Sequence, residues 1–562
     1  MSNRVFAVVI LAAVAALGGF WYYTSQRPIA PPMSGAGNAL ESGDTPKDQP
    51  KPILQGWNRP AAMLVISGEM HGYIEPCGCS QNQLGGLSRR ADLFEKLRTR
   101  TWADETDTAE AGKEQPAAEK PAVEVVGFDL GGVINNNRPS RAQAKLKSAA
   151  IVSSLKVMPY RVLGFGLEEL QVDDQKLGDL VNPIEGLKYV SANVMLIPTG
   201  DVTAANVVAN DLGRVAWTLT TVGGAKIAVT SIVGKRQITD ALGDSGRNDM
   251  IMAVDPGAAL KEVMPKLLEA KADLRVLLSH ASLKETETLI DQFPDFDVVI
   301  SVGGPEDPDP KPTRIGHTLL ATVGEKGKHV GLVGVYPGAA EPARYEGISI
   351  DGRMFQKTER LEEIMRDYQA NLKQEKIAQN QKPVQHPGRG EVTPANANFV
   401  GAKRCGECHS KAYEKWKTSG HAHAMESLSK GRKGEEATWI DRAHDPECLA
   451  CHVTGWEAKI MVPYESGYLF ELPYKDRKGK DVVPDLAGQQ CENCHGPGSE
   501  HALKEQAGKG QINDEVQKWR KFMHLDMSVA EQVCIRCHDG DNSPKFKFPE
   551  YWKKIDHKGM KD

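Results

Sequence analysis

The stretch CENCHGPGSEH, residues 491–501, contains a Cys-x-x-Cys-His motif followed directly by a Gly-Pro-Gly-Ser-x-His segment. The same five-residue motif begins at residues 405, 448, 491 and 534. Cys-x-x-Cys-His is the attachment motif of c-type haem. Two thiols reach the two vinyl groups of one porphyrin, and the adjacent His places its imidazole on the iron. A zinc site would not require a His after the second Cys each time.

The four motifs therefore predict four covalently bound haem c groups. The predicted attachment residues are Cys405, Cys408, Cys448, Cys451, Cys491, Cys494, Cys534 and Cys537, and the predicted proximal iron ligands are His409, His452, His495 and His538. The motifs recur every 43 residues, but their flanking sequences differ, so we interpret the even spacing as coincidence. Four haems between residues 398 and 562 must fill much of the interior and lie near one another, as stepwise electron transfer requires.

The occupant of the sixth position of each iron separates an electron carrier from a catalyst. Two protein ligands favour electron transfer, whereas an open position lets a small molecule bind. Outside the motifs, the C-terminal segment has six further histidines, which are His421, His423, His444, His501, His524 and His557. Six side chains can fill four positions, so the sequence leaves both possibilities open.

Several positions outside the motifs match a known family in order. They are Phe399-Val400-Gly401, Trp416, Ser419-Gly420-His421-Ala422, Val453-Thr454-Gly455-Trp456 and Gly496-Pro497-Gly498-Ser499 with His501. On these residues the segment 398–562 resembles the tetrahaem cytochromes c of the five-fifty-four and c-prime type, a mainly α-helical electron-transfer family. The resemblance implies that His421 and His501 are distal iron ligands. It also allows for one haem without a sixth ligand, as in a member of that family. Our next candidates for distal ligands are His444 and His557, followed by His423 and His524.

The chain as a whole is 40% hydrophobic and 25% charged with a formal net charge of −5, but its N-terminus differs from this average. Such a composition is ordinary for a globular protein and gives no indication of a nucleic-acid partner. Residues 5–23 contain no charge and end in Phe20-Trp21-Tyr22-Tyr23, a length and an aromatic end that suit a membrane-spanning helix. We expect an uncleaved anchor, and a cleaved signal peptide is the alternative. Either one predicts an exported protein on the periplasmic side of the cytoplasmic membrane.

Between residues 59 and 350, short apolar runs alternate with amphipathic stretches. The predicted strands are 123–128, 187–192, 226–233, 274–278 and 296–300, and the predicted helices are 87–97, 142–157, 258–270 and 283–293. This alternation predicts an α/β domain. A further helix is expected within 355–379, where apolar residues recur at helical spacing.

The order of these segments resembles the calcineurin-like metallophosphoesterases, in particular their nucleotidase branch. The resemblance implies a four-layer αββα sandwich with two metal ions. Glu69 and His71 stand where that family has its first Asp-x-His, and His280 matches its Ser-His. The other ligands are replaced, by Gly132 for the bridging Asp, by Leu167 and Glu168 for Asn-His, and by Gly303 and Pro305 for the last two His. A hydrolase that clamps two ions about 3.5–4 Å apart cannot be assembled in the usual way from this set.

Two interpretations of this domain follow. In the first, the fold is retained as a docking or scaffold module. In the second, a different small site is built from Glu69, His71, His280, Cys77 and Cys79. Thiolates with imidazoles would suit copper or zinc. The two cysteines could instead form a disulfide.

The predicted organisation is an anchor at 1–27, a linker at 28–58, a phosphoesterase-like domain at 59–350, a helix and linker at 351–397 and a tetrahaem domain at 398–562. We predict a membrane-anchored periplasmic cytochrome that passes electrons between redox partner proteins, with a non-hydrolytic docking domain. One alternative is a redox enzyme that acts on a small nitrogen or sulfur compound at an open haem. The other is an active phosphoesterase fused to a cytochrome.

Overall fold

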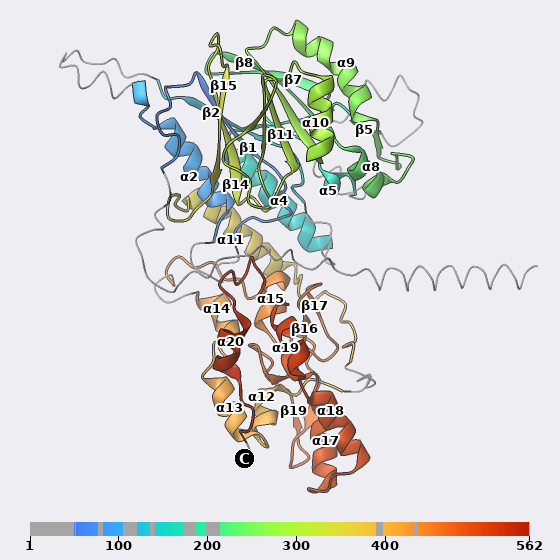
Figure 1. Ribbon diagram of the computed structural model, residues 1–562. Coiled ribbons are helices and arrows are strands. Elements are labelled where there is room, and N and C mark those ends of the chain that lie inside the picture. Colours follow the sequence, from blue (N-terminus) through green and yellow to red (C-terminus); the bar gives the residue numbers. More distant parts are fainter. Residues whose placement is uncertain are drawn as a thin grey trace, which may run out of the picture. The chain divides into compact units, whose positions relative to one another are not determined.

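The structure is a computed structural model of the chain, and Figure 1 labels its elements. It describes residues 50, 52–76, 83–104, 121–134, 141–171, 186–197, 214–388, 397–431 and 436–560. The predicted anchor at 1–27 and most of the linker at 28–58 lie outside these residues. None of the described helices combines the length and the apolar composition that crossing a bilayer requires. The segment Pro52–Asp562 forms one compact unit.

Two β-sheets form the centre of the N-terminal part. The first has the strand order β15-β14-β1-β2-β3-β4-β6, and the second has the order β12-β13-β11-β10-β8-β7. In the first sheet β1, β2 and β3 run parallel, and in the second β10 runs parallel to both β8 and β11. The strands of the first sheet are β1 (Ala62–Ser67), β2 (Glu124–Asp129), β3 (Tyr160–Leu163), β4 (Lys188–Val190), β6 (Arg214–Val215), β14 (His329–Val335) and β15 (Ala343–Ser349). Those of the second are β7 (Trp217–Val222), β8 (Ala225–Val233), β10 (Leu274–Ser282), β11 (Val298–Gly303), β12 (Thr313–Ile315) and β13 (Thr318–Thr322). A small separate hairpin pairs β5 (Val194–Leu196) with β9 (Ile251–Ala253).

The two sheets pack face to face, and helices cover their outer faces (Figure 1). Leu64 and Val126 of the first sheet share a buried cluster with Val229, Leu278 and Ile300 of the second. Helices α2, α4 and α11 pack on the outer side of the first sheet, and α9 and α10 pack on that of the second. These four layers are the αββα arrangement that the sequence resemblance implies. The helices of this part are α2 (Leu87–Arg98), α4 (Arg141–Val157), α5 (Leu167–Leu170), α8 (Lys235–Leu242), α9 (Pro256–Glu269), α10 (Leu283–Gln292) and α11 (Glu359–Gln374).

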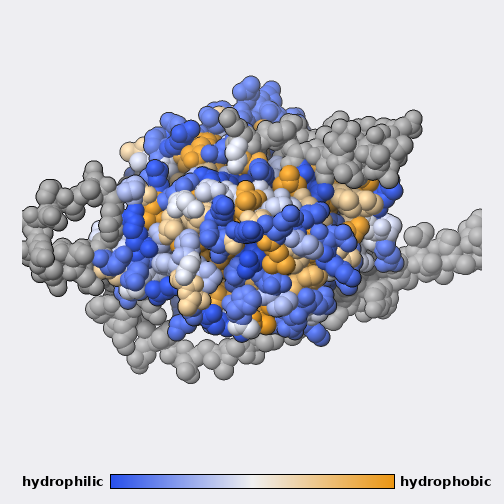
Figure 2. Space-filling view, turned by 90° about the horizontal axis from the view of Figure 1, so that it is seen from above, coloured by the Kyte–Doolittle hydropathy of each residue, from blue (hydrophilic) through white to orange (hydrophobic). Residues whose placement is uncertain are grey.

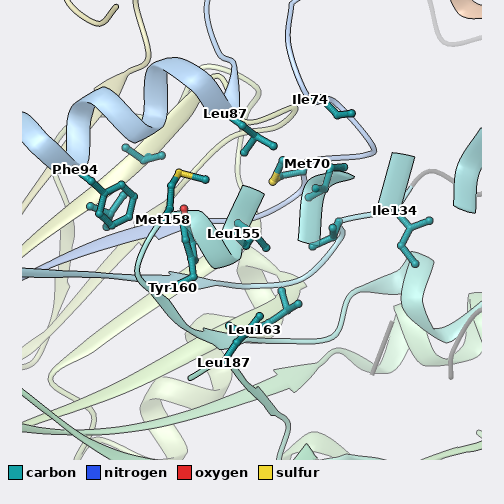
Figure 3. Packing of buried hydrophobic residues seen from close by; sticks show 14 of the residues in the cluster. Met70, Ile74, Leu87, Phe94, Ile134, Leu155, Met158, Tyr160, Leu163 and Leu187 are labelled. Carbon is teal, nitrogen blue, oxygen red and sulfur yellow. The ribbon is translucent and has the colours of Figure 1, made fainter. Parts of the chain in front are cut away.

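The loop after β1 is fixed by the packing shown in Figure 3. Met70 is fully buried in the cluster that also contains Leu87 and Phe94 of α2 and Tyr160 of β3. The rings of Phe94 and Tyr160 lie 5.6 Å apart. Because Met70 is held in this core, the residues on either side of it are held at the carboxyl end of the parallel strands, where ligands bind in open α/β sheets.

The C-terminal part consists of short helices with few buried side chains. Its main apolar cluster contains the buried residues Ala378, Leu428, Leu449, Ala450, Val453 and Trp456. A domain of this size needs a larger core than these side chains supply. The helices are α12 (Gly401–Gly406), α13 (Ser410–Lys417), α14 (Ala424–Lys430), α15 (Pro446–His452), α16 (Cys491–His495), α17 (Ser499–Gly508), α18 (Asp514–Met523), α19 (Met527–Cys534) and α20 (Phe548–Ile555). Two short hairpins join β16 (Trp456–Glu457) to β17 (Val462–Pro463) and β18 (Tyr474–Lys475) to β19 (Asp481–Val482).

The strands and helices predicted between residues 59 and 350 are all present, and α11 lies in the predicted helical segment 355–379. The main difference concerns β10, which continues to Ser282 although the sequence pattern ends the strand at Leu278. Its polar continuation is paired with β8 as far as His280, opposite Val233. The exact domain boundaries stay a prediction.

On the face seen in Figure 2, hydrophilic residues surround small, separate groups of hydrophobic ones.

Candidate metal centres

Each of the four Cys-x-x-Cys-His motifs lies on a short helix or on the turn after one. The third motif is α16 itself, and the second ends α15 at His452. The first and fourth begin in the last turns of α12 and α19. Residues three apart lie on the same side of a helical turn. The two thiols of one motif therefore face the same way, as attachment to one porphyrin requires.

The thiols of different motifs also approach one another. All eight motif cysteines carry free thiols, and only Cys408 among them is exposed. The Cys491 thiol of the third motif lies close enough to Cys405 of the first to raise the pKa of the Cys405 thiol. The Cys451 thiol of the second motif has the same effect on Cys537 of the fourth. The four sites are therefore adjacent, with the first beside the third and the second beside the fourth.

A cavity of about 1000 Å³ lies between the second, third and fourth motifs. Cys448, Cys494 and Cys537 are in its wall, and so are Tyr551 and Trp552 of α20, a helix with no buried residue. Ligand pockets in proteins are typically about 300–1,000 Å³. A cavity of this size, lined with thiols and otherwise uncovered aromatic side chains, fits large apolar cofactors attached through the cysteines.

Three of the motif histidines each face a second imidazole. The ring centres are 6.4 Å apart for His409 and His501, 6.1 Å for His538 and His421, and 5.9 Å for His495 and His557. Two imidazoles on opposite sides of one metal ion, each bound through a ring nitrogen at about 2 Å, have ring centres about 6 Å apart. The three pairs thus have the spacing of two histidines that share one haem iron.

Hydrogen bonds determine which ring nitrogen carries the proton in three of the candidate ligand histidines. In three of them Nδ1 donates to a backbone carbonyl, namely His452 to Ala424 at 2.7 Å, His495 to Met523 at 2.6 Å and His557 to Ile555 at 2.9 Å. Because a carbonyl only accepts, the proton sits on Nδ1 and leaves Nε2 free to bind a metal. Burial lowers the pKa of His421 and of His452, which keeps both imidazoles neutral.

His452, in the second motif, lacks a facing imidazole among the described residues. His444, which the sequence offers as a distal ligand, is half-buried, and His423 is exposed with its Nδ1 3.6 Å from Glu426. Neither of them faces a motif histidine in the part of the chain that the structure describes. The remaining candidate, His524, is exposed. Of the predicted distal ligands, the structure brings His421, His501 and His557 to a motif histidine and leaves His444 apart.

A second cluster of ionisable side chains lies at the carboxyl ends of β1, β3 and β10. Glu69 and His71 follow β1, Glu168 is in the short helix α5 after β3, and His280 is in β10. The ring nitrogens of His71 lie 3.0 Å from Glu69 Oε2 and 3.0 Å from Glu168 Oε1. His280 Nε2 lies 3.0 Å from Glu69 Oε1. Three strands thus bring two carboxylates and two imidazoles into direct contact.

The backbone at this cluster is held in an unusual conformation. Glu69 and His71 have φ angles of 49° and 46°, in the left-handed region that residues other than Gly rarely adopt. The Glu69 N–H donates to Gly131 at 2.9 Å and the His71 N–H to Gly132 at 2.8 Å, so the loop after β1 is bonded to the loop after β2. Strain of this kind persists where the surroundings fix it, and it is concentrated at functional sites.

The charges of the cluster are interdependent. Burial opposes ionisation of Glu69, but His280 and His71 outweigh it and lower the pKa of this carboxyl group. Burial likewise opposes a charge on His71, whereas Glu168 and Glu69 raise its pKa to about 10. The pKa of His280 is also raised, by Glu69 against the effect of burial.

Comparison with known proteins separates the two parts of the chain. Residues 404–496 match the family described as cytochrome c554 and c-prime. The matched cytochrome c554 segment contains the first three motifs. Cytochrome c-554 of Nitrosomonas europaea is 33% identical over an alignment of 163 residues, and the match covers 26% of this chain and 61% of that cytochrome. The chain therefore spans less than two thirds of the length of this relative.

Several solved structures also align with the chain. The 5'-nucleotidase precursor from Thermus thermophilus aligns with a TM-score of 0.43 and 18% identity, over 58% of this chain and 61% of that chain. The NAD nucleotidase of Haemophilus influenzae aligns with a TM-score of 0.42 and 14% identity, over 61% and 64% of the two chains. Reduced cytochrome c554 from Nitrosomonas europaea aligns with a TM-score of 0.20 and 25% identity, over 29% of this chain and 84% of that one.

Sequence reasoning missed one member of the second cluster. Glu168 stands where the phosphoesterase pattern has a His, so the pattern alone marks it as a lost ligand. In the structure its carboxylate is bonded to His71. A carboxylate is itself a metal ligand, and that chemistry was the signal available in the sequence. Cys77 and Cys79, the other predicted members, lie outside the described residues.

Proposed function

We propose that the chain is a multihaem electron carrier whose four motifs hold four haem c groups. Three of these groups lie between paired imidazoles, and the second motif supplies His452 alone. Haem c supplies one-electron chemistry, and two strong axial ligands favour electron transfer over substrate binding. The observation that carries the proposal is the spacing of 5.9–6.4 Å between the rings of the three histidine pairs.

The contacts between motifs support a continuous electron path. The first motif touches the third through Cys405 and Cys491, and the second touches the fourth through Cys451 and Cys537. Cys494 of the third motif also lies close enough to Cys537 to influence its pKa, which burial and the Cys451 thiol raise further. This order connects the sites as first, third, fourth and second.

A second candidate function rests on His452. Since no second imidazole faces it in the described residues, the sixth position of that iron is open in the proposed arrangement. An open position next to a cavity allows a small nitrogen or sulfur compound to bind and to be oxidised or reduced there. The carrier function and this redox activity share the same four sites, so one experiment on spin states bears on both.

Electron paramagnetic resonance of the oxidised haem-loaded protein tests the assignment. We expect three low-spin haems for the three histidine pairs and one high-spin haem at the second motif. The variant His421→Ala should convert one low-spin signal to high-spin, because it removes the partner of His538 at 6.1 Å. His423→Ala, which removes an exposed His two residues away, should leave the spectrum unchanged. Four low-spin signals in the unmodified protein would contradict the open second site.

We further propose that residues 5–23 anchor the protein at the periplasmic face of the cytoplasmic membrane. The support is the absence of any charge in this stretch and the aromatic cluster at its end. Fractionation should recover the haem-loaded protein with membranes, and a chain in which a cleavable signal peptide replaces residues 1–51 should be recovered in the soluble periplasmic fraction. Equal recovery of both chains in the soluble fraction would contradict the anchor.

We also propose that the α/β part is a non-hydrolytic docking module for redox partners. The support is Gly132 in place of a bridging carboxylate and Gly303 and Pro305 in place of the last two histidines. A model phosphate ester with added manganese or zinc should not be hydrolysed above background. Hydrolysis that disappears in the His71→Ala/His280→Ala double variant would revive the phosphoesterase alternative.

A further inference from the structure

The cluster of Glu69, His71, Glu168 and His280 is built like a metal site. Glu69, Glu168 and His280 each offer one ligand atom, and these three atoms lie within 4.8 Å of one another. Ligand atoms bound at about 2.0–2.2 Å to one ion lie at most about 4.4 Å apart. The three side chains therefore need only a small adjustment to share an ion.

The cluster is buried, and two of its polar atoms lack a hydrogen-bond partner. The side chain of His280 is 3% exposed, and those of Glu69 and Glu168 are 13% and 12% exposed. Glu69 Oε1 and His280 Nδ1 make no hydrogen bond. Buried polar atoms without a partner are rare in folded proteins, and a bound ion is one way in which such atoms are satisfied.

The contact between His280 and Glu69 indicates where an ion would sit. In the unprotonated form, which is the form that binds a metal, His280 Nε2 accepts the backbone N–H of Leu167 at 3.3 Å. The same nitrogen lies 3.0 Å from Glu69 Oε1, which is also an acceptor. Two lone pairs face each other across this contact. A cation between them would satisfy both, whereas a proton on Nε2 would break the bond from Leu167.

The same geometry excludes the two-ion arrangement of the phosphoesterase pattern. A Cβ atom on Gly132, the position of the bridging carboxylate, would lie 2.8 Å from Glu69 Oε1. Two further buried carboxylates lie near the cluster, and both are already bonded. Glu169 accepts the N–H groups of Gly132 at 2.9 Å, Val133 at 2.8 Å and Gly166 at 2.7 Å. Asp129 accepts the Ser67 hydroxyl at 2.6 Å and the Gly131 N–H at 2.9 Å. No bridging ligand is left for a second ion among the described residues.

We propose that the α/β part binds one divalent first-row metal ion through Glu69, Glu168 and His280, with His71 beside it as a fourth ligand or as the group that positions the two carboxylates. Two carboxylates with imidazoles form a nitrogen and oxygen ligand set, which suits zinc, manganese or ferrous iron. The expectation of a thiolate site for copper or zinc that includes Cys77 and Cys79 stays a prediction, because both cysteines lie outside the described residues. It is independent of the proposed electron-carrier function.

Metal analysis of the haem-loaded protein tests the proposal. The protein is treated with a chelator, incubated with excess Zn²⁺ or Mn²⁺ and desalted, and its metals are counted by mass spectrometry with covalent haem iron as the internal standard. We expect one zinc or one manganese ion per chain. Two ions per chain that are both lost in cluster variants, or no retained ion, would overturn the proposal.

The variants Glu168→Gln and His280→Ala should each lower the retained zinc at least tenfold. Glu168→Gln keeps the shape of the side chain, so it guards against the case in which His280→Ala fails to fold. Glu306→Gln and His317→Ala, which change residues outside the cluster, should bind as the unmodified protein does. The haem absorption and spin states should be unchanged in all four variants, so failure here is distinguishable from failure of the electron-carrier function. Equal zinc retention in the cluster variants and the controls would also overturn the proposal.

Discussion

His557 is an exposed residue near the C-terminus, and its role follows from two contacts. Its ring centre lies 5.9 Å from that of His495, and its Nδ1 donates to the carbonyl of Ile555, the last residue of α20. Neither contact depends on burial of the side chain. A residue in this position can therefore determine the properties of a haem site without contributing to the hydrophobic core.

We expect His557→Met to raise the reduction potential of the haem at the third motif. A thioether ligand in place of an imidazole favours the reduced iron, and axial ligands tune haem potentials over a range of about 0.8 V. Spectroscopic redox titration should show one midpoint shifted upward and the others unchanged. His423→Met, at an exposed position without a facing motif histidine among the described residues, is the matched control. Unchanged midpoints in His557→Met would argue against ligation by His557.

Gly132→Asp should destabilise the protein rather than restore a second metal. The residue has a φ angle of 73°, and a Cβ atom there would lie 2.8 Å from Glu69 Oε1. Gly338 is a close control, because its φ angle is 74° and a Cβ atom there would meet nothing within 4 Å. Gly338→Asp should cost about 1 kcal/mol through the backbone conformation alone, and Gly132→Asp should cost at least about 2 kcal/mol more through overpacking. Guanidinium unfolding measures both, and equal losses would contradict the steric argument.

At the scale of helices and strands, the spacing of apolar residues along the sequence predicted the elements that bury an apolar face. The strand at 226–233 and the helix at 283–293 appear as β8 and α10 because their apolar spacing matches the faces they bury. The pairing of His409 with His501 and of His538 with His421 could not be predicted from local patterns. Such pairs join residues far apart in the chain, and six candidate histidines allow many combinations. The contact between Glu168 and His71 could not be predicted for the same reason, because these two residues are also far apart in the chain.

Helix α11 carries a buried carboxyl group that should make stability depend on pH. Burial and the hydrogen bond with Glu75 raise the pKa of Glu362 to about 7, above its ordinary value of 4.5. The folded protein therefore holds a proton that the unfolded chain releases at lower pH. The resulting stabilisation is complete below about pH 4.5 and is lost as the pH rises toward 7.

The variant Glu362→Gln mimics the protonated group and should remove this dependence. Guanidinium midpoints measured between pH 5 and about 7.5 should fall more steeply in the unmodified protein than in the variant. Glu363→Gln, which changes the exposed neighbour on the same helix, should retain the slope of the unmodified protein. Parallel slopes in all three proteins would show that Glu362 does not titrate in this range.

At the scale of the whole unit from Pro52 to Asp562, polar contacts connect the α/β part to the second and fourth motifs. Arg442 Nη2 lies 2.9 Å from Glu75 Oε2, and both side chains are buried, at 7% and 5% exposed. Just before the second motif, Asp445 accepts from Gln143 at 2.8 Å. Just after the fourth, Asp541 is paired with Lys328 at 2.6 Å. The α/β part thus directly supports the chain segments beside the second and fourth motifs.

We expect Arg442→Met to lower the free energy of unfolding by about 3 kcal/mol, because it leaves the exposed Lys357, 3.5 Å away, as the remaining cation beside the buried Glu75. The double variant Glu75→Leu/Arg442→Met should recover most of the loss, since an apolar pair leaves no buried charge. Lys235→Met, which removes an exposed ion pair with Asp255, should change stability by less than about 1 kcal/mol. A loss in the double variant as large as in Arg442→Met would show that packing, rather than charge, causes the effect.

The α/β part should also be synthesised and folded before the C-terminal part. The α/β part has large apolar clusters of its own and leaves the ribosome first, so it can complete its fold while residues 398–562 are still being synthesised. Helices α13, α17 and α20 have no buried side chain to hold them together. Cofactor attachment then becomes a maturation step of folding itself. Chains that miss this step should be trimmed by proteases back to the α/β part, so the supply of haem would set how much of the full-length protein accumulates in the cell.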